Sequence, residues 1–364
     1  MTLALRPTLI LSILFPLLHP ELVAGEAQGP RIAVTSRQME ALRKSLSADP
    51  DAARAFAPVR KLADRALQES PNPVKAIFSE GRLYTDPQRK QSLASRQDLM
   101  KMEAVGYVYG LTGKPEYGAK ARTFVLSWAR TYEPDGNPIN ETEFTRLIKA
   151  YDLTGALFSG SERLEMEKWF RRMAEKEKST IRQKSSTLKN NHHSHRLKII
   201  GHIAFLLPDP ELVAWVIEQY KRHLEVNLNP DGTTYDFHER DALHYHTYSL
   251  QPLVELAMAA DRNGADLYGH STSQGANLEQ SIAFLIPYIL GEKEHWEFVR
   301  STVKFDLQRS SAGDPNIQVG EKWRPQKAKP LFDLAGYFNP RFHQVPFPGD
   351  TPAASFERLL STLR

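Results

Sequence analysis

The sequence predicts an all-α protein. Apolar residues recur at the spacing of helix faces in several stretches, whereas the alternation typical of strands is almost absent. Short connections rich in Pro, Gly, Asn and Asp separate these stretches, and short connections make neighbouring helices antiparallel. Many antiparallel hairpins in one domain can curve into a helical toroid or a solenoid, and the sequence has no strict repeat that would establish the curvature.

Three apolar stripes carry the helix prediction, and we expect them to face the core. The first precedes the turn-rich segment 133–138, and the second follows a capping box of Ser159 and Glu162. The stripes are Ala121, Phe124, Val125 and Trp128; Met166, Trp169, Phe170 and Met173; and Ile282, Leu285, Ile286 and Ile289. Pro, Gly and Asp accumulate from about Phe305 to Pro348, which predicts a less regular C-terminal stretch.

Residues 1–25 are typical of a secretory signal peptide, with a basic start at Arg6, an apolar run over 9–18 and small residues before position 26. The run is too short for a stable membrane anchor, and Pro16 and Pro20 interrupt it; a retained anchor is the alternative. No Ser/Gly-rich linker divides the rest, so we expect residues 26–364 to form a single domain. We therefore expect a periplasmic or secreted protein.

Composition narrows the classes of partner. The chain has no cysteine, which excludes disulfides, thiolate metal sites and cysteine nucleophiles. Its formal net charge of +4 favours polyanions, which include nucleic acid, anionic lipid and acidic glycans. Because export favours the glycan, we expect an acidic polysaccharide as the partner and no nucleic acid. We also expect a monomer.

Two segments, 189–196 and 235–248, concentrate the polar residues that could carry chemistry. They hold half of the 12 histidines: His192, His193, His195, His238, His244 and His246. Histidines that cap helices or satisfy core hydrogen bonds would give the same clustering, as would chance. The pattern is therefore a hypothesis for a site and needs a chemical test.

Metal binding is one interpretation of the histidines. His193/His195 and His244/His246 have the one-residue gap that brings ligands together on a strand. On a helix the same gap points the rings apart, and both pairs adjoin helical stretches. Neither pair has an acidic residue at a familiar zinc-binding spacing. We expect no metal or other cofactor.

Metal-free elimination on a uronate is the second interpretation. Removing the C5 proton builds charge on the adjacent carboxyl group, which Asn191, His192 and Arg240 could stabilise. Tyr248 is the candidate base, because neighbouring positive charge would lower a phenol pKa from about 10. His192 as base with Tyr248 as acid is the competing assignment, and a packed core tyrosine is the structural alternative.

These segments resemble the alginate lyase family, helical-toroid polysaccharide lyases whose relatives include enzymes that act on glucuronan. The resemblance extends from about Ala55 to Phe342. It rests on three motifs: Asn190-Asn191-His192, Tyr245-His246-Thr247-Tyr248 with Leu250 and Pro252-Leu253, and, more loosely, the segment 134–141. It implies an incomplete α/α toroid with a glycan groove. By this resemblance Asn191 and His192 neutralise the carboxylate, Arg240 assists, and Tyr248 is both acid and base.

Two departures from the family pattern affect how far the family's residue roles apply to this chain. Arg240 lies eight residues before Tyr248, one more than is typical, and His195 stands where family members often have an aromatic residue. We expect further substrate contacts from Asn190, His246, Tyr245, His195, Asn140 and Arg82. Weaker candidates are Glu80, Tyr84, Asn137, Glu141, Lys304, Arg309 and Trp323, which could bind carboxylates or stack on sugar faces.

The sequence therefore predicts an exported lyase of 1,4-linked polyuronate, with mannuronan-type alginate as the first substrate and glucuronan as the second. A catalytically silent toroid that binds acidic glycans is the alternative from another class. A metal-dependent glycan-degrading enzyme is the third hypothesis.

Overall fold

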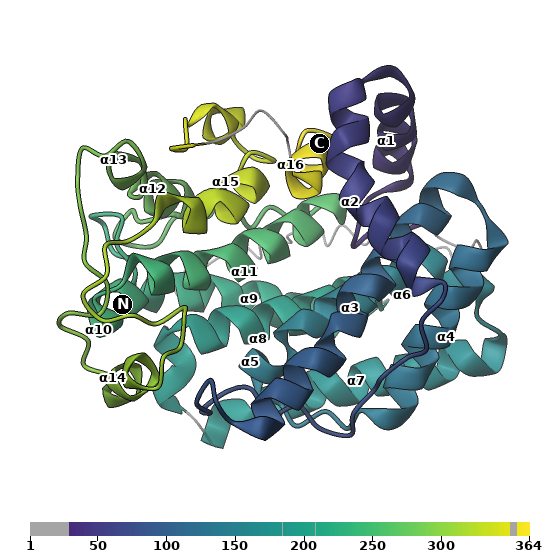
Figure 1. Cartoon of the computed structure of the whole chain (residues 1–364), viewed down its shortest axis with the longest axis horizontal. Coiled ribbons are helices and arrows are strands. Elements are labelled where there is room, and N and C mark those ends of the chain that lie inside the picture. The colour runs from purple at the N-terminus through teal and green to yellow at the C-terminus, as the bar shows by residue number, and fades with distance from the viewer. Residues whose placement is uncertain (1–28, 184, 208, 350–354) are drawn as a thin grey trace, which may run out of the picture.

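The computed structural model describes residues 29–183, 185–207, 209–349 and 355–364, and these are almost entirely helical (Figure 1). Their β-structure is limited to two isolated bridges, Leu228 with Thr234 and Trp296 with Lys322. The longer helices are α1 (Ser36–Ala48), α2 (Pro50–Ala66), α3 (Pro87–Thr112), α4 (Pro115–Thr131), α6 (Thr145–Thr154), α7 (Gly160–Gln183), α8 (Asn191–Leu206), α9 (Pro210–Asn227) and α11 (Leu243–Arg262). Shorter ones are α5 (Pro138–Glu141), α10 (Tyr235–Arg240), α12 (Leu278–Ala283), α13 (Ile286–Ile289), α14 (Lys304–Ser311), α15 (Lys329–Ala335) and α16 (Phe356–Ser361).

The helices form an incomplete α/α toroid, as predicted. The inner helices α3, α6, α8 and α11 pack side by side in that order, and the outer helices α4, α7 and α9 pack behind them (Figure 1). The hairpins leave the ring open between α11 and α2. The C-terminal helices bridge this gap, because α15 packs on α11, α16 on α15, and α16 on α2.

The apolar stripes of the first two predicted helices are buried, as expected. Trp128, Phe124, Phe170 and Met173 are fully buried within one large core. The capping box also forms: the Ser159 hydroxyl accepts from the Glu162 amide (3.3 Å), and the Glu162 carboxylate accepts from the Ser159 amide (2.8 Å). Local sequence signals therefore fix both the start and the orientation of α7.

The third stripe is not one continuous helix. Ile282, Leu285 and Ile289 are buried and Ile286 is half-buried, but the chain forms two short helices, α12 and α13. Pro287 lies at the start of α13, where its missing amide hydrogen is tolerated; inside a longer helix it would remove a hydrogen bond. The stretch 305–348 is less regular, as predicted, with short helices separated by turns.

The contact between the two ends of the described chain closes the gap in the ring. Phe356 of α16 packs against Phe56 of α2 and Tyr107 of α3, with ring centroids 5.4 Å and 4.9 Å apart. The predicted signal peptide lies outside the described residues. No helix in the described part of the chain combines the length and apolar character needed to span a membrane.

Candidate active site

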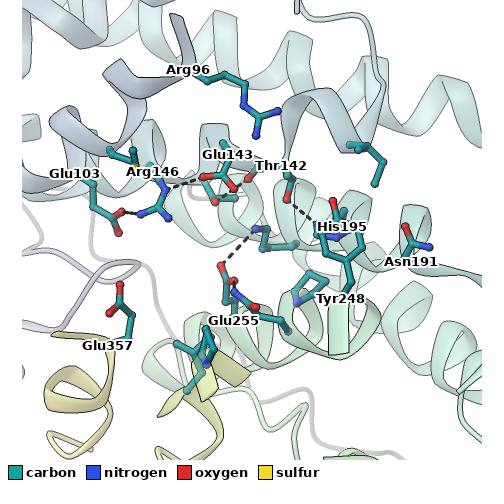
Figure 2. A pocket seen from close by; sticks show the side chains of 18 of the residues that line it. Arg96, Glu103, Thr142, Glu143, Arg146, Asn191, His195, Tyr248, Glu255 and Glu357 are labelled. Carbon is teal, nitrogen blue, oxygen red and sulfur yellow. Dashed lines mark hydrogen bonds and ion pairs between the residues drawn. The ribbon is translucent and has the colours of Figure 1, made fainter. Parts of the chain in front are cut away.

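A cleft of about 1020 Å³ runs along the inner helices of the toroid (Figure 2). Side chains of α3, α6, α8 and α11 line it, together with the loop 79–82 and residues of the C-terminal stretch. The four predicted catalytic residues, Asn191, His192, Arg240 and Tyr248, all line this cleft. The fold thus brings together two segments that are far apart in the sequence, and their catalytic roles stay predictions.

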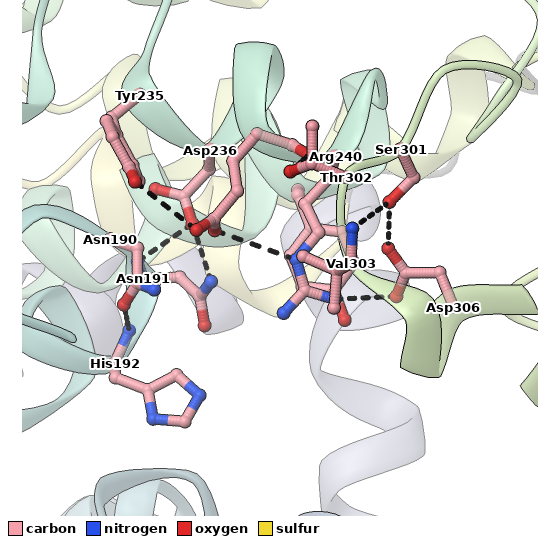
Figure 3. A network of polar contacts seen from close by, with 12 residues as sticks. Asn190, Asn191, His192, Tyr235, Asp236, Arg240, Ser301, Thr302, Val303 and Asp306 are labelled. Atoms are coloured by element: carbon pink, nitrogen blue, oxygen red, sulfur yellow. Dashed lines mark hydrogen bonds and ion pairs between the residues drawn. The ribbon is translucent and has the colours of Figure 1, made fainter. Parts of the chain in front are cut away.

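Asn191 is the first residue of α8, and a buried carboxylate holds its side chain (Figure 3). Asp236 Oδ1 accepts hydrogen bonds from the Asn191 backbone amide (2.9 Å) and from Asn191 Nδ2 (2.5 Å). Asn227 Nδ2 donates to the other oxygen, Asp236 Oδ2 (3.0 Å). Asp236 therefore fixes the orientation of the Asn191 amide from behind the cleft.

His192 is half-buried and follows Asn191 on the first turn of α8. The Asn190 side chain is the N-cap of this helix and accepts from the His192 backbone amide (3.2 Å). Asn190 itself does not line the cleft. The prediction that it contacts substrate is corrected accordingly: its polar side chain starts the helix that presents Asn191 and His192.

Arg240 lies at the C-terminal end of α10, where a buried aspartate anchors it (Figure 3). Its Nη1 donates to Asp306 Oδ1 (2.6 Å), and Ser301 Oγ donates to Asp306 Oδ2 (2.6 Å). The guanidinium also lies over the ring of Tyr245, 4.2 Å from its centroid. The extra residue between α10 and Tyr248 thus does not prevent Arg240 from lining the cleft.

Tyr248 is half-buried on α11 and lies beside His195 (Figure 2), with ring centroids 4.3 Å apart. Burial raises the pKa of the Tyr248 phenol above its usual range, and Tyr245 adds to this; the positive charges of Arg96 and Arg309 offset only part of the rise. Neighbouring positive charge therefore acts in the expected direction, but burial outweighs it, and the expectation of a lowered pKa is wrong. The phenol is protonated at neutral pH, the form needed to donate a proton.

Two other imidazoles flank Tyr248. His195 Nδ1 lies 2.7 Å from Thr142 Oγ1, and burial lowers the pKa of His195 well below its usual value. The ring of His244 is parallel to that of Tyr248, with centroids 6.1 Å apart, and burial lowers its pKa to about 3. Both rings are therefore neutral near pH 7, and both line the cleft.

An unusual turn holds the N-terminus of α11. Asp241 and Phe298 both have positive φ, 46° and 64°, and the Phe298 amide donates to the Asp241 carbonyl (2.7 Å). Glu297, on the same loop, accepts from the first amides of α11, those of Leu243 (2.7 Å) and His244 (3.1 Å). Strained backbone of this kind persists only where surrounding contacts hold it, often near functional sites. Here it fixes the turn between Arg240 and the helix that carries Tyr248.

The remaining predicted contact residues divide into two groups. Tyr245, His195 and Arg82 line the cleft, as do the weaker candidates Glu80 and Arg309. The Tyr245 hydroxyl accepts from Arg309 Nη1 (3.1 Å). The others do not line it: His246, Asn140, Tyr84, Asn137, Glu141, Lys304 and Trp323.

His246 and Asn140 serve the fold, and the prediction that they bind substrate is corrected. His246 is fully buried, with Nδ1 3.0 Å from Thr234 Oγ1 and Nε2 2.8 Å from the Ser281 carbonyl. Asn140 Oδ1 accepts from the amides of Ser79 (3.0 Å) and Glu80 (2.9 Å). It therefore holds the loop that carries Glu80 and Arg82.

Arg96 is a cleft residue that the sequence analysis missed. It reaches into the cleft from α3 (Figure 2), and its Nη1 donates to Ser79 Oγ (3.2 Å). Within the described ranges it forms no ion pair with a carboxylate. A signal was present in the sequence, because Arg89, Arg96 and Glu103 lie seven residues apart and so share one helix face.

The histidine pairs do not converge as metal ligands. His193 and His195 lie on α8, and His244 and His246 lie on α11, where a one-residue gap points the rings apart. In the part of the chain that the structure describes, no three His, Asp or Glu side chains are grouped so that they could hold a metal ion.

Comparison with known proteins identifies the family of the chain. The helical ring has the toroid fold of solved alginate lyases. A sequence profile described as alginate lyase matches residues 43–296, more than half of the chain, so the chain belongs to the alginate lyase family. It is therefore a polysaccharide lyase, and the catalytically silent toroid is set aside. No curated protein matches the chain.

Solved structures show the same fold. An alginate lyase from Bacteroides ovatus is 18% identical, with a TM-score of 0.68 over 92% of this chain and 100% of that chain. Alginate lyase A1-III from Sphingomonas species A1 is 21% identical, with a TM-score of 0.62 over 89% of this chain and 93% of its own. A histidine-to-alanine variant of alginate lyase A1-III, complexed with a tetrasaccharide, is 21% identical, with a TM-score of 0.63 over 95% and 97%.

Proposed function

We propose that this lyase cleaves 1,4-linked polyuronate by metal-independent β-elimination, with mannuronan-type alginate as the first substrate and glucuronan as the second. The observation that carries the proposal is one shared cleft. A phenol, an imidazole, an amide and arginines line it together: Tyr248, His192, Asn191, Arg240 and Arg96. The tetrasaccharide complex of a protein with this fold supports an oligosaccharide ligand.

The carboxylate of the reacting uronate would bind at the N-terminus of α8. The Asp236 contact uses one amide hydrogen of Asn191, which leaves the second for the substrate. His192 and Arg240 would supply a further hydrogen bond and positive charge. These donors stabilise the enolate more than the ground state, because negative charge on the carboxyl group grows as the C5 proton leaves.

Tyr248 would handle the proton. In β-mannuronate and β-glucuronate, H5 and the departing O4 lie on the same face of the ring. One phenolate can therefore take H5 and, as the phenol, donate a proton to O4 as the C4–O4 bond breaks. The raised pKa suits the second step, and it means that the first step requires the phenol to lose its proton beforehand.

His192 as the base, with Tyr248 only as the acid, is the competing assignment. A pH profile of kcat/KM separates the two. If Tyr248 is the base, kcat/KM rises about tenfold per pH unit to beyond pH 9, because a buried phenol titrates above its ordinary value of about 10. If His192 is the base, the rise levels off at a lower pH than for Tyr248, because an imidazole is a weaker base than a phenolate.

The direct test of the proposed function follows the double bond that β-elimination creates. Mannuronan, guluronan and glucuronan are each incubated with the enzyme, with and without a chelator, and near-ultraviolet absorbance is recorded. We expect an increase with mannuronan or glucuronan that the chelator does not change. Loss of the signal with the chelator would contradict the metal-independent mechanism. No signal from any of the three polymers would contradict the polyuronate assignment.

We also propose that the protein is periplasmic or secreted, because residues 1–25 are typical of a signal peptide. Mass spectrometry of the N-terminus of the protein expressed in a Gram-negative host would test this. A start near residue 25 is the expected result, whereas a chain that begins at Met1 would contradict it.

A further inference from the structure

Charged side chains line the cleft differently on the two sides of Tyr248. The first side, which we call the cationic half, lies at the N-terminal ends of α3, α8 and α11. Its charged lining residues are Glu80, Arg82, Arg89, Arg96, Arg240 and Arg309. The second side, the balanced half, is lined by residues further along α3, α8 and α11, by residues of α6, α15 and α16, and by Glu143 just before α6. Its basic lining residues are Arg146, Lys149, Lys198, Arg262 and Lys329, and its acidic ones are Glu103, Glu143, Glu255, Asp333 and Glu357.

In the cationic half, the carboxylates that pair with Arg240 and Arg309 lie behind the wall of the cleft, whereas Arg82 pairs with the partly exposed Asp86 (2.9 Å). Arg240 pairs with Asp306 (2.6 Å) and Arg309 with Asp314 (2.9 Å). Both aspartates are fully buried, and neither lines the cleft. Arg96 forms no ion pair with a carboxylate in the described residues, although it is near enough to Glu143 of the other half to interact with it electrostatically. A ligand in this half therefore meets guanidinium groups with almost no carboxylate beside them.

In the balanced half, the carboxylates line the cleft beside the cations (Figure 2). Arg146 bridges Glu103 and Glu143, with Nε 2.8 Å from Glu143 Oε2. Lys149 Nζ lies 3.3 Å from Glu103 Oε1, and Lys198 Nζ lies 3.4 Å from Glu255 Oε2. Each of these cations is already neutralised by a carboxylate that also faces the ligand.

These carboxylates keep their charge. Burial alone would raise the pKa of Glu255, but Lys198 and Lys149 lower it to about 2. Burial would likewise raise the pKa of Glu143, and Arg146 and Lys198 lower it to about 2. A uronate carboxylate placed in this half would therefore meet fixed negative charges as well as the cations paired with them, and would gain little net attraction. Most of the apolar lining also lies here, including Met100, Ala104, Pro252, Met258, Leu334 and Phe356.

We propose that the balanced half binds uncharged sugar units, so that the enzyme cleaves a 1,4-linked polyuronate faster where the reacting uronate adjoins a neutral hexose or N-acetylhexosamine. The inference rests on the proposed uronate lyase function. The reacting uronate occupies the cationic half beside Asn191 and His192, and its neighbour beyond Tyr248 packs on the apolar wall. Hydroxyl groups can bond to paired Glu and Lys side chains without the repulsion that a carboxylate would meet.

The test changes the charge of the neighbouring sugars and nothing else. The polyuronate that the enzyme cleaves best is partly carboxyl-reduced, which converts scattered uronates into neutral hexoses with the same linkages. We expect kcat/KM per remaining uronate to rise at least about twofold. A fall relative to the parent polymer would overturn the inference and leave the lyase function intact. If no parent polyuronate is cleaved, the proposed function itself fails.

Two substitutions test whether the carboxylates of the balanced half cause this preference. Glu357→Gln alters an exposed residue of α16, so the fold is preserved; Glu103→Gln is the second variant. Both should reduce the advantage of the carboxyl-reduced polymer by raising kcat/KM on the parent polyuronate. Glu165→Gln is the matched control, because Glu165 pairs with Arg130 (2.8 Å) and does not line the cleft. If the cleft variants behave like this control, the assignment of the balanced half is wrong.

Discussion

The two halves of the cleft contain similar numbers of basic side chains but present opposite environments to a ligand. In the cationic half the balancing aspartates are buried behind the wall, as Asp306 is behind Arg240. In the balanced half the balancing glutamates line the cleft, as Glu103 does beside Arg146. Two like charges about 4 Å apart repel by about 4 kcal/mol at the effective dielectric of a protein surface. The placement of carboxylates, and not the number of Arg and Lys residues, therefore decides where a polyanion binds.

Replacing the residue at the junction of the two halves should have the largest effect. Tyr248→Phe removes the hydroxyl that handles the proton, so we expect kcat on the cleaved polyuronate to fall by about 10³-fold or more. Binding of the same polymer, measured by isothermal titration calorimetry, should change little. Tyr268→Phe is the matched control, because Tyr268 lies outside the cleft and its buried hydroxyl has no hydrogen-bond partner in the described residues. A Tyr248→Phe enzyme with near-normal kcat would show that another group is the acid and base.

A pair of substitutions compares the halves directly. Arg96→Gln removes an arginine without a carboxylate partner, so we expect kcat/KM on polyuronate to fall by about 10- to 100-fold, the value of a charge-assisted hydrogen bond. Lys149→Gln removes a cation that Glu103 already neutralises, so we expect a fall of less than about threefold. Steady-state kinetics at low and high salt would measure both. Equal losses would remove the distinction between the halves.

A smaller effect is expected from Asp236, the buried carboxylate that holds the Asn191 side chain in the cationic half. Asp236→Asn places an amide donor against the amides of Asn191 or Asn227, so one of their hydrogen bonds is lost. We expect kcat to fall by about tenfold, because the Asn191 amide loses its fixed orientation, with a loss of about 1–3 kcal/mol in the free energy of unfolding. Kinetics and denaturant unfolding would measure the two effects. Normal kcat in a destabilised variant would mean that Asp236 serves only the fold.

The smallest expected effect involves two buried carboxylates, Glu141 and Glu177, of which only Glu177 forms an ion pair, with Arg196 (3.2 Å). Burial raises the pKa of both Glu141 and Glu177, that of Glu177 to about 7, and an oxygen of each carboxylate has no hydrogen-bond partner in the described residues. The folded protein therefore holds a proton that the unfolded chain loses above about pH 4.5. The contribution of this pair to the free energy of unfolding should fall by about 1–3 kcal/mol as the pH rises from about 4.5 to 7. Above about pH 7 this contribution should level off.

Glu141→Gln tests this pair by thermal unfolding between pH 5 and pH 8. The glutamine amide can donate permanently to Glu177, while Arg196 keeps its contact with Glu177 (3.2 Å). We expect the variant to lose the decline in Tm that the natural chain shows over this range. An unchanged decline would assign the pH dependence to other groups.

The sequence predicted the helical class, the capping box and the first two core stripes because these signals are local. It also identified Asn191, His192, Arg240 and Tyr248 as candidate site residues, since family motifs and chemically suited residue types coincide there. His246 was predicted wrongly, although the helical period separates it from Tyr248: residues four apart, such as His244 and Tyr248, share a face, and residues two apart do not. Asn140 and Asn190 were predicted wrongly because turn amides and helix caps use the same polar residues as binding sites do.

Other features could not be predicted because they depend on packing between distant segments. The spacing of Arg89, Arg96 and Glu103 could place Arg96 on one helix face with the other two, but only the packing of α3 against α6 places that face in the cleft. The burial of Tyr248 reversed the direction expected for its pKa, because desolvation outweighs the nearby arginines. The contrast between Asp306 behind the wall and Glu103 in the lining likewise depends on the tertiary fold.

The most direct test of the central claim is a crystal structure of the Tyr248→Phe variant with an oligouronate bound. The predicted result is a uronate whose carboxylate accepts hydrogen bonds from Asn191 Nδ2 and His192, with its C5 hydrogen facing the substituted ring. A uronate carboxylate seated instead between Glu103 and Glu255, with the N-terminus of α8 unoccupied, would contradict the account.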